Sequence, residues 1–328
     1  MRTFHVRRAV ISMLLAALAS PLTVAAQQFP SKPVTIIVPS PPGGPSDIIT
    51  RLIAQHLTAS LGQSVVVENR PGAAGFVGMQ AAARSAPDGY TLILSSLVYQ
   101  VLNPVLYKEK LPYTPDRDFI PVALLAHVPY ILVAAPNFPP NDVKQVVQLA
   151  KQNPDKFNYG LPGGIGNTSH IAGELFKKIA GIDLVPVPYQ GDAQSLTALM
   201  GNQIELQFTT PLGVMPHANG GRMKILATAT PVRLSVLPDV PTFAEQGFPD
   251  MDVSTWFSFL APAATPRAVA QKLNTEINKV LEMPQVQKQI EKLGAIPAGG
   301  SLENIQSFMK SEAVRWAKRV EDSGAKTE

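Results

Sequence analysis

The sequence has 328 residues, of which 45% are hydrophobic and 16% are charged, and it contains no cysteine. This composition is typical of a globular protein and excludes an intrinsically disordered chain, and the length suits two domains of ordinary size. Three of the 28 Lys and Arg residues lie in the first 26 positions, which leaves 25 cationic against 24 acidic residues afterwards, so charge does not favour a nucleic-acid partner.

The first 26 residues are typical of a secretory signal peptide. Three arginines precede an apolar stretch at 9–19, Pro21 follows it, and Val-Ala-Ala at 24–26 is a small-residue cleavage motif. The alternative is an N-terminal membrane anchor, which Pro21 and the small-residue end disfavour. We expect cleavage near Ala26 and a soluble, exported mature protein, because no later apolar run approaches transmembrane length.

The next segment predicts alternating strands and helices. A continuous apolar run at 34–38 predicts a buried strand, and apolar residues at helical spacing predict a helix that Gly62 ends, with Ser46 or Asp47 as its N-cap. Strands at 65–67 and 91–94 follow, separated by a turn spaced by Gly72, Gly75 and Gly78 and a helix through Ala83. This order predicts a parallel, doubly wound sheet.

After the polar, Pro-rich connection 107–121, two strand-like runs at 122–126 and 131–134 are separated by Pro129, where the chain is expected to pass between domains. A second β/α series follows. Its expected strands are 157–160, 185–187, 204–208 and 224–229, and its expected helices include 142–152 and one ending at 179. The strand at 256–260 is expected to cross back to the first domain, and the chain ends in expected helices at 267–282, 284–293 and 302–320. We therefore predict an α/β fold of two doubly wound domains joined by a hinge: domain 1 is 27–125 plus 252–328, and domain 2 is 126–251.

Each half contains a loop rich in Gly and Pro directly before a helix, at 39–47 and 161–170. Ligands in open α/β sheets bind beyond the carboxyl ends of the strands, so two such loops are expected at one cleft. A loop without bulky side chains exposes backbone N–H groups, and a helix N-terminus favours negative charge. Neither loop contains Lys or Arg, which predicts a small organic anion held by amides, with an affinity that is flat from pH 6 to 8.

Catalytic motifs are absent from the sequence. There is no Gly-x-Ser-x-Gly, His-Glu-x-x-His, P-loop or Cys nucleophile, so we expect no enzyme activity, no cofactor and no metal. The stretch 164–169 lacks the third glycine of a dinucleotide fingerprint. His170 and Asp47 are interpreted as residues that cap or support helix starts, and the pair Trp256-Phe257 faces either a ligand or the core.

Seven stretches resemble the tripartite tricarboxylate transporter substrate-binding proteins, also called the TctC or Bug receptor family. They are "FPSKPVTIIVPSPPGGPSDIITRLIAQHL", "GQSVVVENRPGAAG", "APDGYTLIL", "NPVLY", "HIAGELF", "VPYQG" and "LPDVPTFAEQGFP". The resemblance covers essentially the whole chain after the signal peptide, in order. It implies a monomeric periplasmic receptor of the type II binding-protein kind, which closes over a di-, tri- or aromatic carboxylate and delivers it to membrane transporter subunits.

The resemblance also implies the ligand-binding residues. They are Ser40, Pro41, Pro42, Gly43, Gly44, Ser46, Asp47, Ser95, Ser96, Gly164, Gly166, Asn167, Thr168, His170, Tyr189, Gln190 and Thr209. Three positions depart from the family pattern: Ser40 stands where an aromatic is common, Gln190 where Lys is frequent, and Thr209 where Asp is frequent. Two alternatives stay open, namely a ligand-sensing receptor for a two-component kinase and, less favoured, a secreted α/β hydrolase.

Overall fold

The computed structural model describes residues 29–107, 110–217 and 220–325. The predicted signal peptide and its cleavage site lie outside the described residues. Residues 32–328 form one compact unit. None of the helices in the described part is long and apolar enough to cross a membrane.

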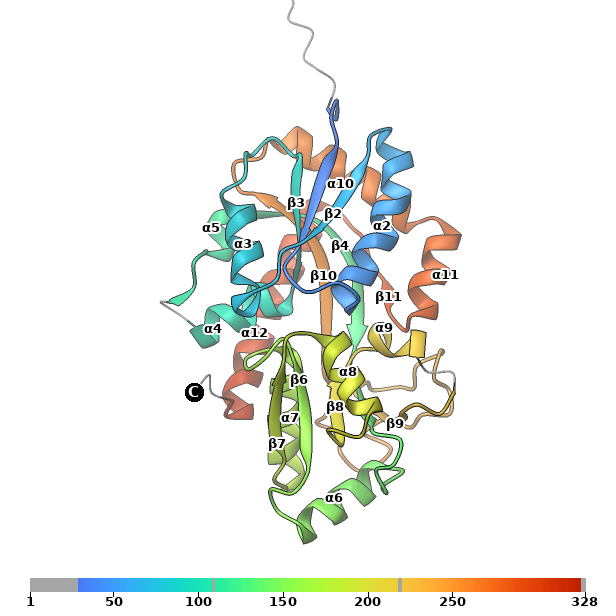
Figure 1. Cartoon of the computed structure of the whole chain (residues 1–328). Helices are drawn as coiled ribbons and strands as arrows, with labels where there is room; N and C mark the ends of the chain where they lie inside the picture. Colours follow the sequence, from blue (N-terminus) through green and yellow to red (C-terminus); the bar gives the residue numbers. More distant parts are fainter. Residues whose placement is uncertain (1–28, 108–109, 218–219, 326–328) are drawn as a thin grey trace, which may run out of the picture. The chain divides into compact units, whose positions relative to one another are not determined.

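The compact unit 32–328 contains two β-sheets (Figure 1). Sheet A has the order β11-β4-β10-β3-β1-β2, and sheet B has the order β7-β6-β8-β5-β9. The strands of sheet A are β1 (Val34–Val38), β2 (Val65–Asn69), β3 (Thr91–Ser96), β4 (Phe119–Pro129), β10 (Ser254–Pro262) and β11 (Ile296–Pro297). Those of sheet B are β5 (Ile131–Ala134), β6 (Asn158–Pro162), β7 (Val185–Tyr189), β8 (Leu206–Thr209) and β9 (Lys224–Thr228). The prediction of a two-sheet α/β fold is confirmed.

The sheets are mixed rather than wholly parallel. β1 pairs in parallel with β2 and β3, and β6 pairs in parallel with β7 and β8. β10 is antiparallel to β3 and β4, and β5 is antiparallel to β8 and β9. The reason is the route of the chain: β5 and β10 each enter their sheet directly from the other sheet, without a crossover helix, and therefore run against its parallel strands.

Helices cover both faces of each sheet, as a doubly wound fold requires. The helices are α2 (Pro45–Leu61), α3 (Phe76–Ala83), α4 (Asn103–Tyr107), α5 (Pro115–Asp118), α6 (Val143–Gln152), α7 (Thr168–Ala180), α8 (Asp192–Met200), α9 (Pro211–Val214), α10 (Arg267–Leu281), α11 (Pro284–Lys292) and α12 (Leu302–Ser323). Short η segments lie at Ala73–Gly75, Val98–Leu102 and Met215–His217. α2 and α10 pack together beside sheet A, whereas α12 contacts both β4 and α7 (Figure 1).

The chain changes sheet at two adjacent segments. One is Tyr130, the single residue between β4 and β5, and the other is the segment that ends at Val253, directly before β10. The N–H of Tyr130 donates to Val253 O at 2.9 Å, and its carbonyl accepts from Ala229 N at 2.8 Å. The Val253 N–H in turn donates to Ala229 O at 3.1 Å. The connections between the two sheets are thus held together by backbone hydrogen bonds.

Candidate functional site

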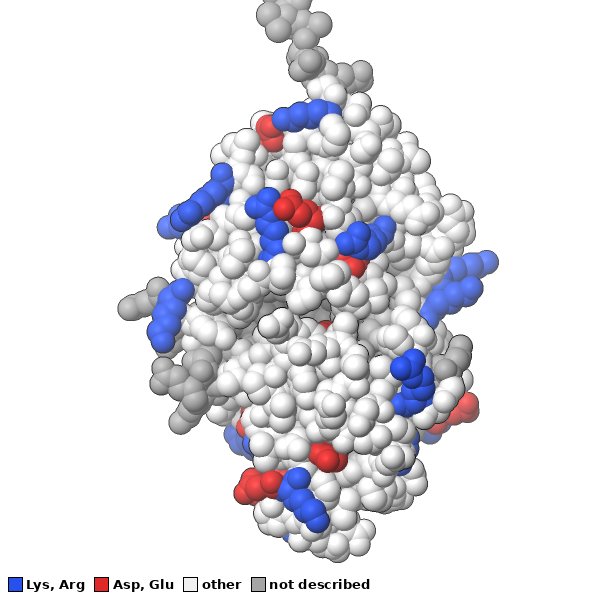
Figure 2. Space-filling model, viewed as in Figure 1, with Lys and Arg blue, Asp and Glu red and all other residues white. Residues whose placement is uncertain are grey.

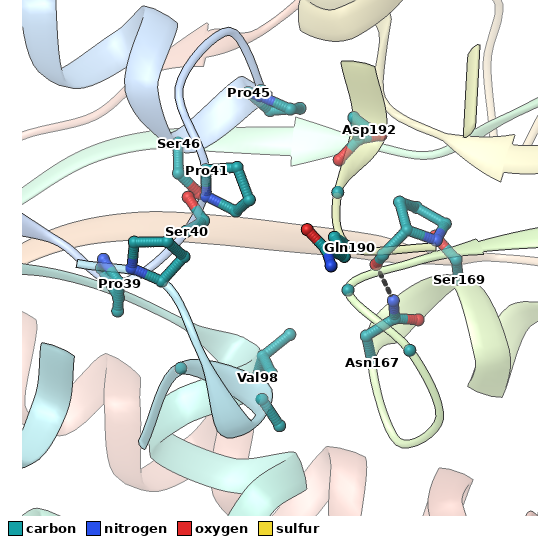
Figure 3. Close-up of a pocket in the computed structure, with 18 of the residues that line it drawn as sticks. Pro39, Ser40, Pro41, Pro45, Ser46, Val98, Asn167, Ser169, Gln190 and Asp192 are labelled. Carbon is teal, nitrogen blue, oxygen red and sulfur yellow. Dashed lines mark hydrogen bonds between the residues drawn. The ribbon is translucent and has the colours of Figure 1, made fainter. Parts of the chain in front are cut away.

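A cavity of about 1060 Å³ lies where the carboxyl ends of the parallel strands of both sheets meet. Its wall is built by the segments that follow β1, β2, β3, β6, β7 and β8. Figure 2 shows a hollow between the two halves, bordered mainly by residues other than Lys, Arg, Asp and Glu. Figure 3 shows two groups of labelled residues that face each other across the cavity: Pro39, Ser40, Pro41, Pro45, Ser46 and Val98 on one side, and Asn167, Ser169, Gln190 and Asp192 on the other. This is the arrangement expected from the two loops in the sequence.

The loop after β1 leads into α2 through Gly44, which is the N-cap, and Pro45 is the first helical residue. The expected cap at Ser46 or Asp47 is therefore wrong. The reason is Pro45: its fixed φ suits the first helical position, where the missing N–H costs no intrahelical bond. The helix starts earlier than its apolar periodicity indicates, and Gly43 supplies the left-handed turn before it, with a φ of +80°.

Asp47 holds this loop from within the first turn of α2. Its carboxylate accepts from Gly43 N at 3.0 Å, Arg51 Nε at 2.9 Å and Asn69 Nδ2 at 3.0 Å. Burial alone would raise the pKa of Asp47, but the hydrogen bonds from Arg51, Gly43 and Asn69 outweigh it and keep that pKa below its ordinary value. Asp47 is thus an ionised support that orients the loop.

The loop after β6 is also built for tight turns. Gly163, Gly164 and Gly166 have φ values of +86°, +85° and +89°, which favour glycine. Asn167 caps α7 by accepting from His170 N at 2.8 Å, and its amide donates to Pro162 O. His170 Nδ1 accepts from Gly166 N at 3.2 Å, and burial lowers the pKa of this imidazole, which therefore stays neutral.

Twelve of the seventeen expected ligand-binding residues line the cavity. They are Ser40, Pro41, Pro42, Gly44, Ser46, Ser96, Gly164, Asn167, Thr168, Tyr189, Gln190 and Thr209. The five others do not line it: Gly43, Asp47, Ser95, Gly166 and His170. Their side chains or backbone groups face the loops or the sheet, so the structure gives them a supporting position instead of a direct one.

Several lining residues were missed by the sequence analysis. They are Pro71, Gly72, Ala73, Ala74, Gly75, Tyr99, Asn103, Asp192, Thr210 and Thr255. The sequence predicts Gly72 and Gly75 only as residues of a turn. The sequence nevertheless carries a signal that these glycines line the site, because they follow β2 and the carboxyl ends of parallel strands meet at one edge of a sheet. Of the aromatic pair on β10, Trp256 is buried in the core and Phe257 lines the cavity.

Asp192, at the start of α8, projects into the cavity (Figure 3). Its Oδ1 accepts from Thr209 Oγ1 at 2.7 Å. Burial raises the pKa of Asp192 to about 6, although the hydrogen bond from Thr209 opposes this. No other Asp or Glu, and no Lys, Arg or His, is among the described residues that line the cavity.

The chemistry available in the cavity is that of a binding site for an anion. In the first turn of α2, Pro45 has no N–H and the Asp47 N–H donates to Gly44 O, which leaves the N–H of Ser46 for a ligand. In the first turn of α7, the His170 N–H donates to Asn167 Oδ1, which leaves those of Thr168 and Ser169. The hydroxyls of Ser40 and Thr210 are buried there without a hydrogen-bond partner. Buried polar atoms are normally hydrogen bonded, so these two unsatisfied hydroxyls indicate a missing ligand or water. Groups of His, Cys, Asp and Glu that suit a metal ion are absent from the described residues.

The family model described as "Tripartite tricarboxylate transporter family receptor" matches residues 49–325. The protein BugT of Bordetella pertussis is 33% identical over 97% of this chain and 97% of its own length. Among solved structures, Rpa4515 of R. palustris with adipate is 32% identical, with a TM-score of 0.88 over 91% of this chain and 99% of that one. MatC from Rhodopseudomonas palustris, with bound malate, is 32% identical, with a TM-score of 0.83 over 89% and 100% of the two chains.

Proposed function

Since the chain belongs to the tripartite tricarboxylate transporter receptor family, we propose that it is a periplasmic receptor for a small organic acid. It captures a di-, tri- or aromatic carboxylate in the cavity and delivers it to a membrane transporter of the tripartite tricarboxylate type. The observation that carries the proposal is a cavity lined by two helix N-termini and unsatisfied hydroxyls, without a cationic side chain among its lining residues.

The binding energy comes from N–H groups and hydroxyls. A helix N-terminus attracts a carboxylate by about 0.3 to 1 kcal/mol when exposed and by up to about 2 kcal/mol when partly buried. Two such termini, together with charge-assisted hydrogen bonds, support a micromolar dissociation constant, which corresponds to about 8 kcal/mol. Proline rings, Val98 and Phe257 supply apolar surface for the carbon skeleton of the acid.

The size of the cavity favours a hydrated complex. A water molecule occupies about 30 Å³ in the liquid, so a volume of about 1060 Å³ holds a small dicarboxylate together with several waters. Such waters bridge a ligand to backbone groups at little cost in affinity. The twelve lining residues expected from the sequence contact the ligand directly or through water. Gly43, Asp47, Gly166 and His170 hold the loops in place, whereas Ser95 lies within β3.

Closure of the cavity is a hinge motion between two domains, one built on sheet A and one on sheet B. The expected boundaries, 126 and 251, lie within four residues of Tyr130 and Val253, where the chain passes between the sheets. Changes of φ and ψ at a few such positions are enough for domain closure. The mature receptor is a soluble monomer without catalytic activity, released by cleavage near Ala26.

A thermal-shift screen tests the proposal. The panel is adipate, malate, citrate and benzoate, with adipamide and putrescine as neutral and cationic controls. A ligand at one hundred times its dissociation constant adds about 2.7 kcal/mol, which raises the melting temperature of a chain of this size by roughly 5 °C. We expect that shift from at least one carboxylate and from neither control. A response to adipamide or putrescine, with none to any carboxylate, would contradict the proposal.

A further inference from the structure

A receptor for carboxylates that lines its cavity with a carboxyl group presents an electrostatic conflict. Asp192 is the one lining residue, within the described part of the chain, that carries an acidic or basic side chain. A ligand carboxylate close to an ionised Asp192 would be repelled, and no lining cation offsets that repulsion.

The position of the Asp192 carboxyl group places it directly opposite the first loop. Oδ1 is occupied by the hydrogen bond from Thr209 Oγ1 at 2.7 Å. Oδ2 lies 4.0 Å from the point where a Cβ on Gly44, the N-cap of α2, would stand. The carboxyl group also accepts from the backbone N–H of Asp192, and Oδ2 is the oxygen that faces a ligand bound at the α2 N-terminus.

The titratable groups on the neighbouring elements leave Asp192 without a cationic partner. From the η segment Val98–Leu102 and the β4–β5 junction, Tyr99 and Tyr130 face it, and burial raises the pKa of both phenols, which stay neutral. On α2, Asp47 is engaged by Arg51. On α7, the neutral His170 accepts from Gly166.

We propose that Asp192 binds the ligand carboxylate in its protonated form, with Oδ2–H as the donor, so that capture of the ligand takes up a proton from solvent. The proton binds Oδ2, Oδ1 continues to accept from Thr209, and no covalent bond of the ligand changes. The inference rests on the proposed function, because it presupposes a carboxylate in this cavity. It also gives Asp192 a role in specificity, since a neutral carboxyl donates to an oxygen anion.

The inference predicts a definite pH dependence. In the free receptor the pKa of Asp192 is about 6, and an adjacent ligand carboxylate raises it further. For a fully ionised ligand, affinity is then highest below pH 6, and it falls as the pH rises until the pH passes the pKa of Asp192 in the complex. If the ligand raises that pKa by at least one unit, affinity falls at least about fivefold between pH 6 and pH 8. The expectation of a flat profile considered only the loops 39–47 and 161–170, and Asp192 lies outside both.

Isothermal titration calorimetry with adipate and malate at pH 7, in two buffers of different ionisation enthalpy, measures the proton uptake directly. We expect about half a proton or more per bound dicarboxylate in the wild type. Asp192→Asn keeps an acceptor for Thr209 and an N–H donor for the ligand, and it should bind with no proton uptake and a flat pH profile.

Two matched variants control the experiment. Asp142 caps α6 by accepting from Gln145 N at 2.7 Å and does not line the cavity, so Asp142→Asn should retain the wild-type proton uptake. His56→Gln on α2, which does not line the cavity either, should retain it as well, which excludes a histidine outside the cavity as the source.

The outcomes are distinguishable. Dicarboxylate binding by the wild type without proton uptake would overturn this inference and leave the proposed function standing. The absence of binding by either dicarboxylate at any pH would overturn both. Binding of an amino acid that Asp192→Asn abolishes would overturn the inference in another way, because Asp192 would then be the ionised partner of an ammonium group.

Discussion

Pro41 lies against Gly191 across the cavity: the Cγ and Cδ atoms of the proline ring are 3.2 and 3.4 Å from the point where a Cβ on Gly191 would stand. Gly191 is the N-cap of α8 and is extended, with a φ of −177°, so its backbone accepts any residue. The backbone conformation therefore does not require glycine at this position. The lack of a side chain instead allows the loop that contains Pro41 to come close to the N-terminus of α8.

Gly191→Val tests whether the close contact between Pro41 and Gly191 is needed for ligand binding. The added methyl groups would overlap the Pro41 ring, and overpacking of this kind costs about 1 to 3 kcal/mol. We expect the affinity for a dicarboxylate to fall at least about fivefold. X-ray scattering should show a smaller radius of gyration for the ligand-saturated wild type, and a reduced contraction for the variant. Wild-type affinity in Gly191→Val would contradict a role of this contact in closure.

Asp47→Asn should destabilise the fold and weaken binding, because the amide lacks the negative charge and offers only one acceptor oxygen to Gly43, Arg51 and Asn69, which now share two. We expect a loss of about 1 to 3 kcal/mol in the free energy of unfolding at pH 7. The folded pKa of Asp47 lies below the ordinary value of 3.8, so its contribution is present above about pH 4 and disappears as the pH falls through the folded pKa. Urea unfolding at pH 7 and pH 3 checks this. A difference between the two proteins that is the same at both pH values would be inconsistent with an ionised Asp47.

Asp192→Asn should have the opposite effect on the ligand-free protein. Its carboxyl has a pKa of about 6 in the fold against an ordinary value of 3.8, so the fold loses stability as the pH rises from about 4 through 6. A difference of this size corresponds to at most about 3 kcal/mol. In urea unfolding, the stability of the variant relative to the wild type should increase between pH 4 and pH 8. A relative stability that does not change over this range would show that Asp192 titrates normally.

The outline of the fold was predictable because its signals are local. The apolar run at 34–38 is β1, Gly62 ends α2, and Pro284 begins α11, as their patterns indicate. The orientation of β5 and β10 was not predictable, since it depends on the absence of a crossover helix. The contact between Asp192 and Thr209 was not predictable either. It joins residues 17 positions apart that follow or end two different strands, and no local sequence pattern indicates that they meet.

Thr210→Val and Thr265→Val form a matched pair. Both threonine hydroxyls are buried and have no hydrogen-bond partner, but only Thr210 lines the cavity. Replacing an unsatisfied hydroxyl with a methyl group should leave the stability of the ligand-free protein unchanged or raise it in both variants. Calorimetry should show dicarboxylate affinity about threefold to tenfold weaker in Thr210→Val only, which corresponds to roughly 0.5 to 1.5 kcal/mol. Equal affinities in the two variants would mean that the ligand makes no use of the Thr210 hydroxyl.

The crystal structure of the complex with the panel carboxylate that gives the largest thermal shift tests the central claim most directly. We expect a carboxylate group of the ligand inside the cavity, with an oxygen roughly 2.7 to 3.2 Å from a first-turn N–H of α2 or α7, or joined to it by one water. A cavity that stays empty at saturating ligand, or a carboxylate held by a Lys or Arg side chain outside it, would contradict the account.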